Sequence, residues 1–262
     1  MAPRSRATVG SSFRLARFRE HKILWSSRGA AASTTVPPFL NGFFTRFAHE
    51  KLRAFPWRLE NVPPFHLLLA EVLLLQTKAE DVARVWPELV RRYPTPDVLA
   101  KAKAPMLVKL LRPLGLQNQR ARSLKTISKT LVDRFSGHVP KTVEGLLSIP
   151  HVGLYTAAAV ASFGFGRRVP IVDANVLRVL GRVTGENSGR DLRRSGHTWS
   201  LAWAILPEKH CARHNYGILD FASLVCTVQH PRCGLCPLQN KCWYGRQQLS
   251  ANRSRDLLGG TA

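Results

Sequence analysis

The sequence has no stretch of about 18 consecutive apolar residues, which excludes a membrane-spanning helix. It also has few acidic residues: 16 Asp and Glu stand against 39 Lys and Arg, giving a formal net charge of +23. An excess of this size favours a polyanionic partner, of which nucleic acid is the leading candidate; the alternative is a basic surface that is simply solvated. Hydrophobic residues make up 45% of the 262 residues, enough to bury the core of one large domain or two smaller ones.

The first 36 residues lack the apolar segment of a secretory signal, and Glu20 is their only acidic residue. We expect residues 1–36 to form a basic, disordered arm that adds non-specific DNA affinity. A transit-type peptide and a start codon assigned too early are the alternatives. The expected location is cytoplasmic and nucleoid-associated, with organellar targeting by the arm as the other outcome. Residues 246–262 are expected to form a C-terminal tail.

Internal repeats are lacking, as is the alternation of polar and apolar residues that is typical of half-buried strands. Apolar residues recur instead at helical spacing, which predicts an all-α fold with short loops. The expected helices lie at residues 37–53, 63–77, 78–93, 95–102, 104–115, 117–135, 142–149, 155–164, 173–183, 198–206 and 214–226.

Cysteine is scarce, with five residues in the chain, yet four of them are crowded into residues 226–242. Because a secretory signal is lacking, disulfides are not expected, and the crowding predicts a metal site. Zinc sites more often show two Cys-x-x-Cys pairs, whereas this segment has one, so the spacing favours an iron–sulfur cluster. The predicted ligands are Cys226, Cys233, Cys236 and Cys242, Cys211 stands apart, and the basic residues around them are Arg232, Lys241 and Arg246.

A glutamate stands in the most apolar predicted helix. Glu71 lies in "LLLAEVLLL", where an ionised carboxylate without a partner would be costly. Burial raises the pKa of a carboxyl group, which suits a general acid near neutral pH; the alternative is a solvated side chain at a helix end. Gln76 follows five positions later and is either ordinary surface or a wedge that fills a vacated space in a stack of DNA bases.

The segment "LLSIPHVGLYTAAAV" predicts two helices joined by a tight hairpin. Backbone N–H groups at such a helix start form a site for a DNA phosphate, and a plain corner between helices is the alternative. The DNA contacts predicted here are His151, Val152, Gly153 and Thr156. Asp173 precedes the next helix and could be only its N-cap. Together with a buried Glu71, however, it forms the pair of carboxylates in different environments that glycosidic-bond chemistry uses.

Three features together resemble the endonuclease III/MutY superfamily of helix-hairpin-helix DNA glycosylases. They are the segment "FPWRLENVPPFHLLLAEVLLLQTKAEDV", the segment "IPHVGLYTAAAVASFGFGRRVPIVDANVLRV" and the 6-2-5 cysteine spacing. The resemblance covers roughly residues 37–245 and implies a [4Fe–4S] cluster and extrusion of the target base from the duplex. It implies a cluster domain at 37–62 and 176–245, a six-helix barrel with the hairpin at 63–175, and a DNA-binding cleft between the two domains.

The resemblance also bears on the reaction. Tyr155 stands where endonuclease III-like enzymes carry the lysine that forms a Schiff base, which implies a monofunctional glycosylase without an efficient lyase step. Chain length, Tyr155 and the "VDAN" at 172–175 are most similar to the Mig-type mismatch thymine glycosylases. Adenine glycosylases of the MutY type more often read "VDGN" and add a C-terminal domain, for which this chain is expected to have no room. His151 departs from the glycine that is usual in the family hairpin; it either adopts a left-handed backbone or reaches a phosphate.

The resemblance gives each candidate residue a role. Asp173 would stabilise the cationic sugar and orient the attacking water, Glu71 would protonate or hydrogen-bond the departing base, and Tyr155 would line the pocket. Gln76 would occupy the gap left by the extruded nucleotide. The expected function is removal of thymine, and of uracil, mispaired with guanine, by a monomer bound to mismatched double-stranded DNA. An adenine glycosylase acting on A:G or A:8-oxoguanine pairs is the alternative, because a protonated Glu71 suits adenine N7. A non-catalytic protein that binds DNA damage is a third.

Overall fold

The computed structural model describes residues 36–185 and 196–258, with side chains except at 196–198 and 251–258. Every regular element in these residues is a helix, which confirms the predicted all-α fold. The chain divides into two compact units, one formed by Arg53–Val169 and the other by the residues up to Leu52 together with those from Pro170 onward. None of the described helices is long and apolar enough to cross a membrane. The expected N-terminal arm lies outside the described residues, apart from residue 36.

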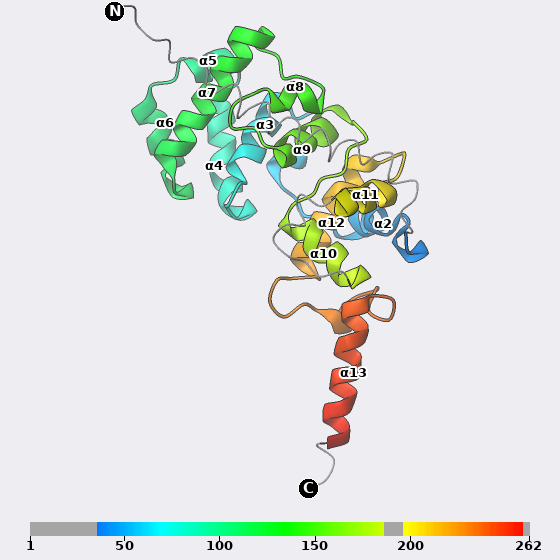
Figure 1. The fold of residues 1–262 in the computed structure, drawn as a ribbon. Coiled ribbons are helices and arrows are strands. Elements are labelled where there is room, and N and C mark those ends of the chain that lie inside the picture. Colours follow the sequence, from blue (N-terminus) through cyan, green and yellow to red (C-terminus); the bar gives the residue numbers. More distant parts are fainter. Residues whose placement is uncertain (1–35, 186–195, 259–262) are drawn as a thin grey trace, which may run out of the picture. The chain divides into compact units, whose positions relative to one another are not determined.

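The unit Arg53–Val169 contains the middle of the chain (Figure 1). Thr95 and Thr142 start two of its short helices as N-caps, each accepting a hydrogen bond from a backbone N–H three residues ahead. The long basic helix expected at 117–135 has those same bounds in the structure. The elements of the unit are η3 (Pro56–Arg58), α3 (Pro64–Leu73), α4 (Ala79–Arg92), α5 (Pro96–Ala100), α6 (Ala104–Leu111), η4 (Arg112–Leu114), α7 (Gln117–Phe135), α8 (Val143–Leu147) and α9 (Leu154–Phe165).

Helix α3 forms the centre of this unit. Pro64 occupies its first turn, where the missing N–H costs no helical hydrogen bond. From Phe65 on, every residue except His66 is buried, as expected for a helix that is apolar on all sides. α3 packs against α9, and the approach is close, because a Cβ on Gly164 would lie 3.2 Å from Cδ2 of Leu67. The pair α3–α9 therefore joins the apolar helix to the helix that follows the hairpin.

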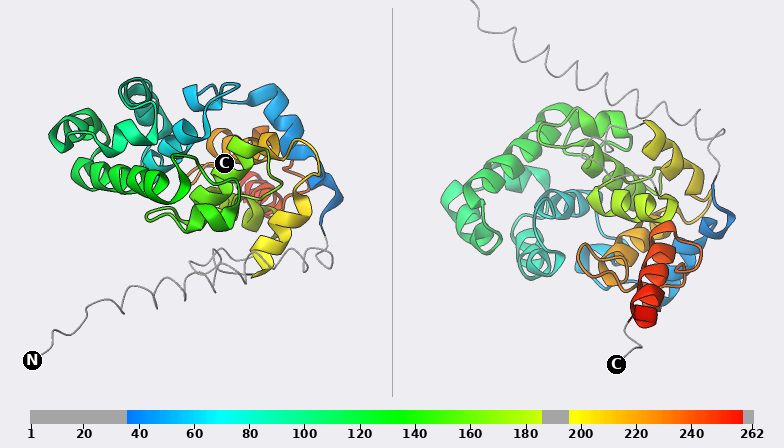
Figure 2. Two further views of the ribbon diagram at one scale, coloured as in Figure 1. Left: turned by 90° about the horizontal axis from the view of Figure 1, so that it is seen from above. Right: turned by 60° about the horizontal axis from the view of Figure 1, so that its bottom comes forward.

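The other unit combines the first described helices with the last ones (Figures 1 and 2). α2 lies along α12 so closely that a Cβ on Gly217 would stand 2.0 Å from the carbonyl oxygen of Phe44. Phe44 and Phe47 meet the ring of Phe221 edge to face, with ring centroids 5.7 and 5.3 Å apart. The elements of the unit are η2 (Pro38–Leu40), α2 (Phe43–Lys51), α10 (Ala174–Thr184), α11 (Gly196–Ile205), α12 (Cys211–Leu224), η6 (Cys233–Leu235) and α13 (Trp243–Leu258).

Two of the differences from the elements expected from the sequence lie near the start and the end of the described residues. The helix expected at 37–53 is divided by Gly42, whose left-handed backbone (φ 66°) separates η2 from α2. Most of the expected tail at 246–262 belongs to α13, which runs to Leu258. Because α13 is rich in polar residues and lacks a distinct apolar face, hydrophobic periodicity does not predict it.

Candidate active site

Glu71 lies in the interior of α3. Its side chain is only 2% exposed, and the leucines at 67–69 and Leu73 in the same helix are buried as well. This burial excludes the alternative of a solvated glutamate at a helix end. The side chain is thus enclosed by the fold, a position in which a glutamate can serve as a general acid.

Gln76 lies three residues beyond the last residue of α3, not within the helix as expected from the sequence. Its backbone is left-handed, with a φ of 58°, and its side chain is exposed. A non-glycine residue rarely adopts this conformation, so the turn must be stabilised by its surroundings. The position is compatible with a wedge, because the side chain projects from a turn and is not packed in a core.

The predicted hairpin is present between α8 and α9. His151 has a φ of 66° and an exposed side chain, so it adopts the left-handed backbone that a glycine would adopt without strain. Val152 is buried, and its N–H donates to the carbonyl of Ile149 at 3.3 Å, which closes the turn. Gly153 is the N-cap of α9; it provides no side-chain cap, and the space around it is open. An uncapped helix start that faces open space is suited to an anion.

Tyr155 and Thr156 occupy the first turn of α9 and differ in exposure. Tyr155 is half-buried. Thr156 is 1% exposed, and its Oγ1 has no hydrogen-bond partner, so its side chain is not placed to reach DNA from this position. Only the backbone N–H of Thr156, as one of the first-turn donors of α9, is suited to the phosphate contact predicted for it.

Asp173 is the N-cap of α10, which agrees with the first of the two roles predicted for it, a helix cap or a catalytic carboxylate. Its Oδ1 accepts hydrogen bonds from the backbone N–H groups of Asn175 and Val176, both at 2.8 Å. Its Oδ2 accepts a third hydrogen bond from Nδ2 of Asn175 at 2.7 Å. The cap does not exclude catalysis, because the side chain stays half-exposed while three donors fix its orientation.

A chain of hydrogen bonds links Asp173 to the cysteine segment. Oδ1 of Asn175 accepts from Nη1 of Arg178 at 3.1 Å, and Nε of Arg178 donates to the carbonyl of Cys226 at 2.9 Å. Nη2 of Arg178 donates to the carbonyl of Ala222 at 3.0 Å. Burial lowers the pKa of the Arg178 guanidinium. Sequence reasoning did not identify Asn175 or Arg178, although arginines at 178 and 182, four residues apart on α10, share one helix face.

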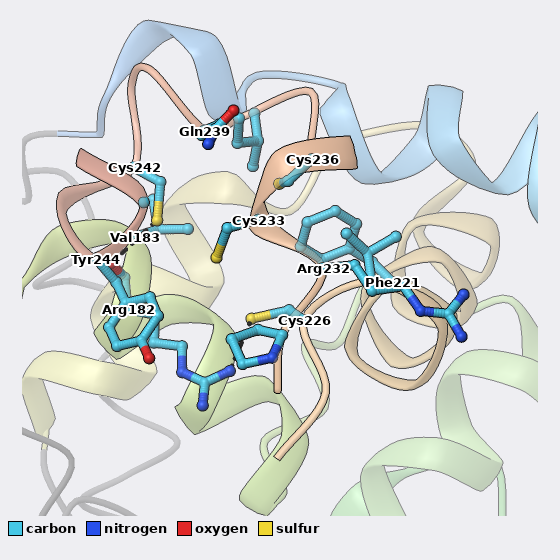
Figure 3. Close-up of a pocket in the computed structure, with 14 residues that line it drawn as sticks. Arg182, Val183, Phe221, Cys226, Arg232, Cys233, Cys236, Gln239, Cys242 and Tyr244 are labelled. Carbon is cyan, nitrogen blue, oxygen red and sulfur yellow. Dashed lines mark hydrogen bonds between the residues drawn. The ribbon is translucent and has the colours of Figure 1, made fainter. Parts of the chain in front are cut away.

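The four clustered cysteines line one pocket (Figure 3). All four are free thiols, and their sulfur atoms lie around a common space. Arg182 borders this space from α10: its Nη1 lies 3.5 Å from Sγ of Cys226 and 2.6 Å from the carbonyl of Thr227. The thiol of Cys242 donates to the carbonyl of Arg182 at 3.2 Å.

The thiols interact electrostatically within this pocket. Burial raises the pKa of Cys236 to about 11, with a smaller contribution in the same direction from the neighbouring cysteines and an opposing one from the backbone N–H of Leu238. The same two causes, burial first, raise the pKa values of Cys233 and Cys242. Burial therefore favours the neutral thiol form of these three cysteines.

The four cysteines can be compared with what a zinc ion and an iron–sulfur cluster each require. Within the described part of the chain, no three His, Cys, Asp or Glu side chains are close enough together to hold a single metal ion. Four thiols spread around an intervening space suit a polynuclear cluster better than one tetrahedral zinc ion. Three exposed basic residues flank the pocket and are available for phosphate: Arg232, Lys241 and Arg246. Cys211, in contrast, is buried against Trp203 and Leu206, away from the residues that line the pocket.

Comparison with known proteins gives thymine-DNA glycosylases and adenine DNA glycosylases among the relatives of this chain. The thymine-DNA glycosylase of Aeropyrum pernix is 38% identical over 195 residues, 72% of this chain and 86% of that protein. The thymine/uracil-DNA glycosylase of Pyrobaculum aerophilum is 38% identical over 191 residues, 71% of this chain and 81% of that protein. The adenine DNA glycosylase of Mycobacterium tuberculosis is 35% identical over 192 residues, 73% of this chain but 63% of that protein.

Solved structures agree with the sequence relatives. A thermostable thymine-DNA glycosylase superposes with a TM-score of 0.75 at 29% identity and covers 85% of this chain and 98% of its own. A non-covalent endonuclease III–DNA complex gives a TM-score of 0.68 at 27% identity, over 79% of this chain and 95% of its own. The family described as HhH-GPD superfamily base excision DNA repair protein matches residues 69–198. The chain therefore belongs to the HhH-GPD superfamily of base excision DNA repair proteins.

Proposed function

We propose that this protein is a DNA glycosylase that hydrolyses the N-glycosidic bond of thymine, and of uracil, mispaired with guanine in double-stranded DNA. The observation that carries the proposal is its 38% identity with thymine and thymine/uracil glycosylases over more than four fifths of their length. The net charge of +23 supplies the attraction to the DNA backbone. A monomer is the proposed active form, because one chain contributes both proposed catalytic carboxylates.

Asp173 is the proposed stabiliser of the reacting sugar. As the bond to the base breaks, positive charge develops on the deoxyribose, and a fixed carboxylate lowers the energy of that state. The three hydrogen bonds from Asn175 and Val176 support this role, because they orient the carboxylate before the substrate binds. The same group is proposed to orient the water that adds to the sugar carbon.

Glu71 is the proposed partner of the departing base. The bond electrons leave with the base, and a proton or hydrogen bond from a buried carboxyl group makes that departure easier. Its burial on α3 among leucine side chains supports this role.

Tyr155 supports hydrolysis without strand cleavage. A lyase step requires an amine that attacks the sugar carbon to form a Schiff base, and a phenol on the first turn of α9 has no such amine. The proposed product is therefore an intact strand with an abasic site.

We propose further that Cys226, Cys233, Cys236 and Cys242 hold a [4Fe–4S] cluster. When bound, such a cluster would supply structural cross-links within the segment; the proposed hydrolysis requires no electron transfer. The donor set supports the assignment, because four free thiols line one pocket with space between them. Iron analysis of protein purified without oxygen should give about four iron atoms per chain.

Removal of adenine from A:G or A:8-oxoguanine pairs is the alternative function. It is supported by the 35% identity with an adenine glycosylase and by the buried Glu71, since adenine N7 can accept a proton. Thymine lacks an equivalent acceptor. The thymine-DNA glycosylase reported above is nevertheless more similar to this chain than the adenine glycosylase is, and it is matched over a larger share of its length.

Base release from four duplexes under single-turnover conditions tests the proposal: T:G, U:G, A:G and A:8-oxoguanine. Alkali added afterwards reveals abasic sites, and a parallel sample without alkali reports lyase activity. We expect cleavage of the T and U strands that depends on alkali. Cleavage of the adenine strands alone would replace the proposal with its alternative. Mismatch binding without base release from any duplex would indicate a non-catalytic protein.

The substitution Asp173→Asn tests the role of Asp173 with little change to the structure. The amide keeps Oδ1 as an acceptor for the start of α10, so the fold should be retained. It lacks the negative charge that opposes the sugar cation, so base release should be abolished while DNA affinity is largely spared. Full activity in this variant would refute the role of Asp173.

A further inference from the structure

Several turns in the unit Arg53–Val169 present an exposed side chain on a left-handed backbone, and two of them lie at Gln76 and Leu116. Gln76 follows α3 with a φ of 58°, and Leu116 precedes α7 with a φ of 49° and 57% of its surface exposed. Residues other than glycine populate this conformation only when other interactions stabilise it, and an exposed leucine gains nothing from burial there. Both turns therefore need an interaction that holds them in place.

Arg120 supplies that interaction for both turns. On the side of Gln76, its Nη1 donates to the carbonyl of Leu73 at 3.0 Å and its Nη2 to the carbonyl of Leu75 at 3.2 Å. Nη2 also donates to Oγ1 of Thr77, so the hydrogen bonds lie on both sides of Gln76. On the side of Leu116, Nε donates to the carbonyl of Gly115 at 3.0 Å. One planar guanidinium thus bridges two turns that lie far apart in the sequence.

Stability alone does not account for this arginine. Its side chain is 7% exposed, and burial lowers the pKa of the guanidinium. Its acceptors are three carbonyls and a hydroxyl, and no carboxylate among the described residues forms an ion pair with it. A buried charge that lacks a counter-ion is costly, and an apolar side chain could fill the same space at a lower desolvation cost. What only the arginine provides is a fixed geometry of the two turns.

We propose that Arg120 is a positioning residue for base extrusion, which holds the turn of Gln76 against the turn of Gly115 and Leu116. Gln76 then meets the duplex with its backbone already ordered, so that no ordering entropy is lost when it fills the space of the extruded nucleotide. Arg120 itself is buried and acts through Gln76. This inference rests on the proposed glycosylase function and on the wedge role of Gln76.

The test compares three substitutions and a control. Arg120→Lys keeps the charge but removes the fork that reaches several acceptors at once. Thr77→Val removes the hydrogen bond that Arg120 donates to Oγ1 of Thr77, with little change in side-chain volume. It replaces Arg120→Lys in the test if that variant folds poorly. Gln76→Ala removes the wedge. Arg122→Met is the matched control, because Arg122 is exposed on the same helix and its loss removes one positive charge without touching the turn.

Two readouts separate positioning from general stability. The first is the single-turnover rate of uracil release from U:G. The second is the fluorescence of 2-aminopurine beside a tetrahydrofuran site opposite guanine, which reports insertion of a side chain and needs no base removal. We expect Arg120→Lys and Gln76→Ala each to lower the release rate roughly 10- to 100-fold and to reduce the fluorescence change. Thr77→Val should move both readouts in the same direction by less, and Arg122→Met should leave the fluorescence change intact.

The double variant Arg120→Lys/Gln76→Ala decides the proposal. If Arg120 acts through Gln76, the double variant is no slower than the slower single variant. Multiplied effects in the double variant, or an unchanged fluorescence response in Arg120→Lys and in Thr77→Val, would overturn the proposal. Absence of base release by the unsubstituted protein would instead refute the proposed function, and the fluorescence response would still decide the role of Arg120.

Discussion

Arg178→Met should separate Asp173, the proposed catalytic aspartate, from the cysteine segment. In the structure, one guanidinium donates to Asn175, to the carbonyl of Cys226 and to that of Ala222, and Asn175 in turn donates to Asp173. Three hydrogen bonds from a charged, half-buried donor predict a loss of about 2–4 kcal/mol in the free energy of unfolding. Because Asn175 loses its own anchor, Asp173 becomes less well oriented, and we expect base release to slow by roughly 10- to 100-fold.

The control for Arg178→Met is Arg182→Met. Arg182 stands one turn further along α10 and holds the same segment through the carbonyls of Thr227 and Val228, but no hydrogen bond links it to Asn175. Both variants should therefore loosen the cysteine segment, and only Arg178→Met should release Asn175. The assay is single-turnover release of uracil from U:G, with iron content and denaturant unfolding measured on the same samples. Equal losses of rate in the two variants at equal iron content would refute the linkage through Asn175.

Three further predictions follow from single positions. Tyr155→Lys places an amine on the first turn of α9 and should produce strand cleavage without alkali, trapped by borohydride as a covalent complex; no trapped complex would contradict the assignment of this position. His151→Gly removes a side chain from a φ of 66° and should leave the melting temperature unchanged or raise stability by up to about 1 kcal/mol; a clear loss of stability would refute the strain argument. Burial lowers the pKa of His214 from 6.5 to about 4, so the folded state binds fewer protons and stability is lost as the pH falls from about 6.5 towards 4. Denaturant unfolding at pH 7 and pH 4.5 should show this loss, on the order of 3 kcal/mol at its fullest, and His214→Phe should reduce it; an unchanged pH dependence in that variant would exclude His214 as its source.

Local sequence patterns predicted the parts of the molecule that depend on local physics. Helical periodicity predicted α7 with its bounds, and the uniformly apolar context of Glu71 predicted a buried position. Capping chemistry predicted Asp173 at the start of α10. Each of these features is determined within a few residues of chain, where periodicity and propensity carry information.

The features that the sequence did not predict depend on contacts between distant residues. Arg120 hydrogen-bonds Leu75 across 45 positions, and Arg178 hydrogen-bonds Cys226 across 48. An arginine on a helix is usually solvated, so no local pattern distinguishes these two from the exposed Arg122. The departure of Gln76 from α3 has the same origin, since its left-handed turn is held by hydrogen bonds from Arg120.

Buried Arg120 and half-buried Arg178 have one feature in common that bears on how this fold specifies a site. Each donates mainly to backbone carbonyls, and each holds a segment that carries a residue assigned to the reaction: Gln76 for Arg120, and Asp173, through Asn175, for Arg178. Carbonyl acceptors at a turn do not depend on the side chains around them, so the surface of each turn can vary while its backbone geometry is kept. The free energy lost by removing each guanidinium from water is then the cost of fixing the orientation of the segment that it holds. Substitution by methionine should for that reason slow base release by the folded protein as well as reduce its stability, whereas the loss of an arginine that served stability alone would leave the rate of the folded protein unchanged.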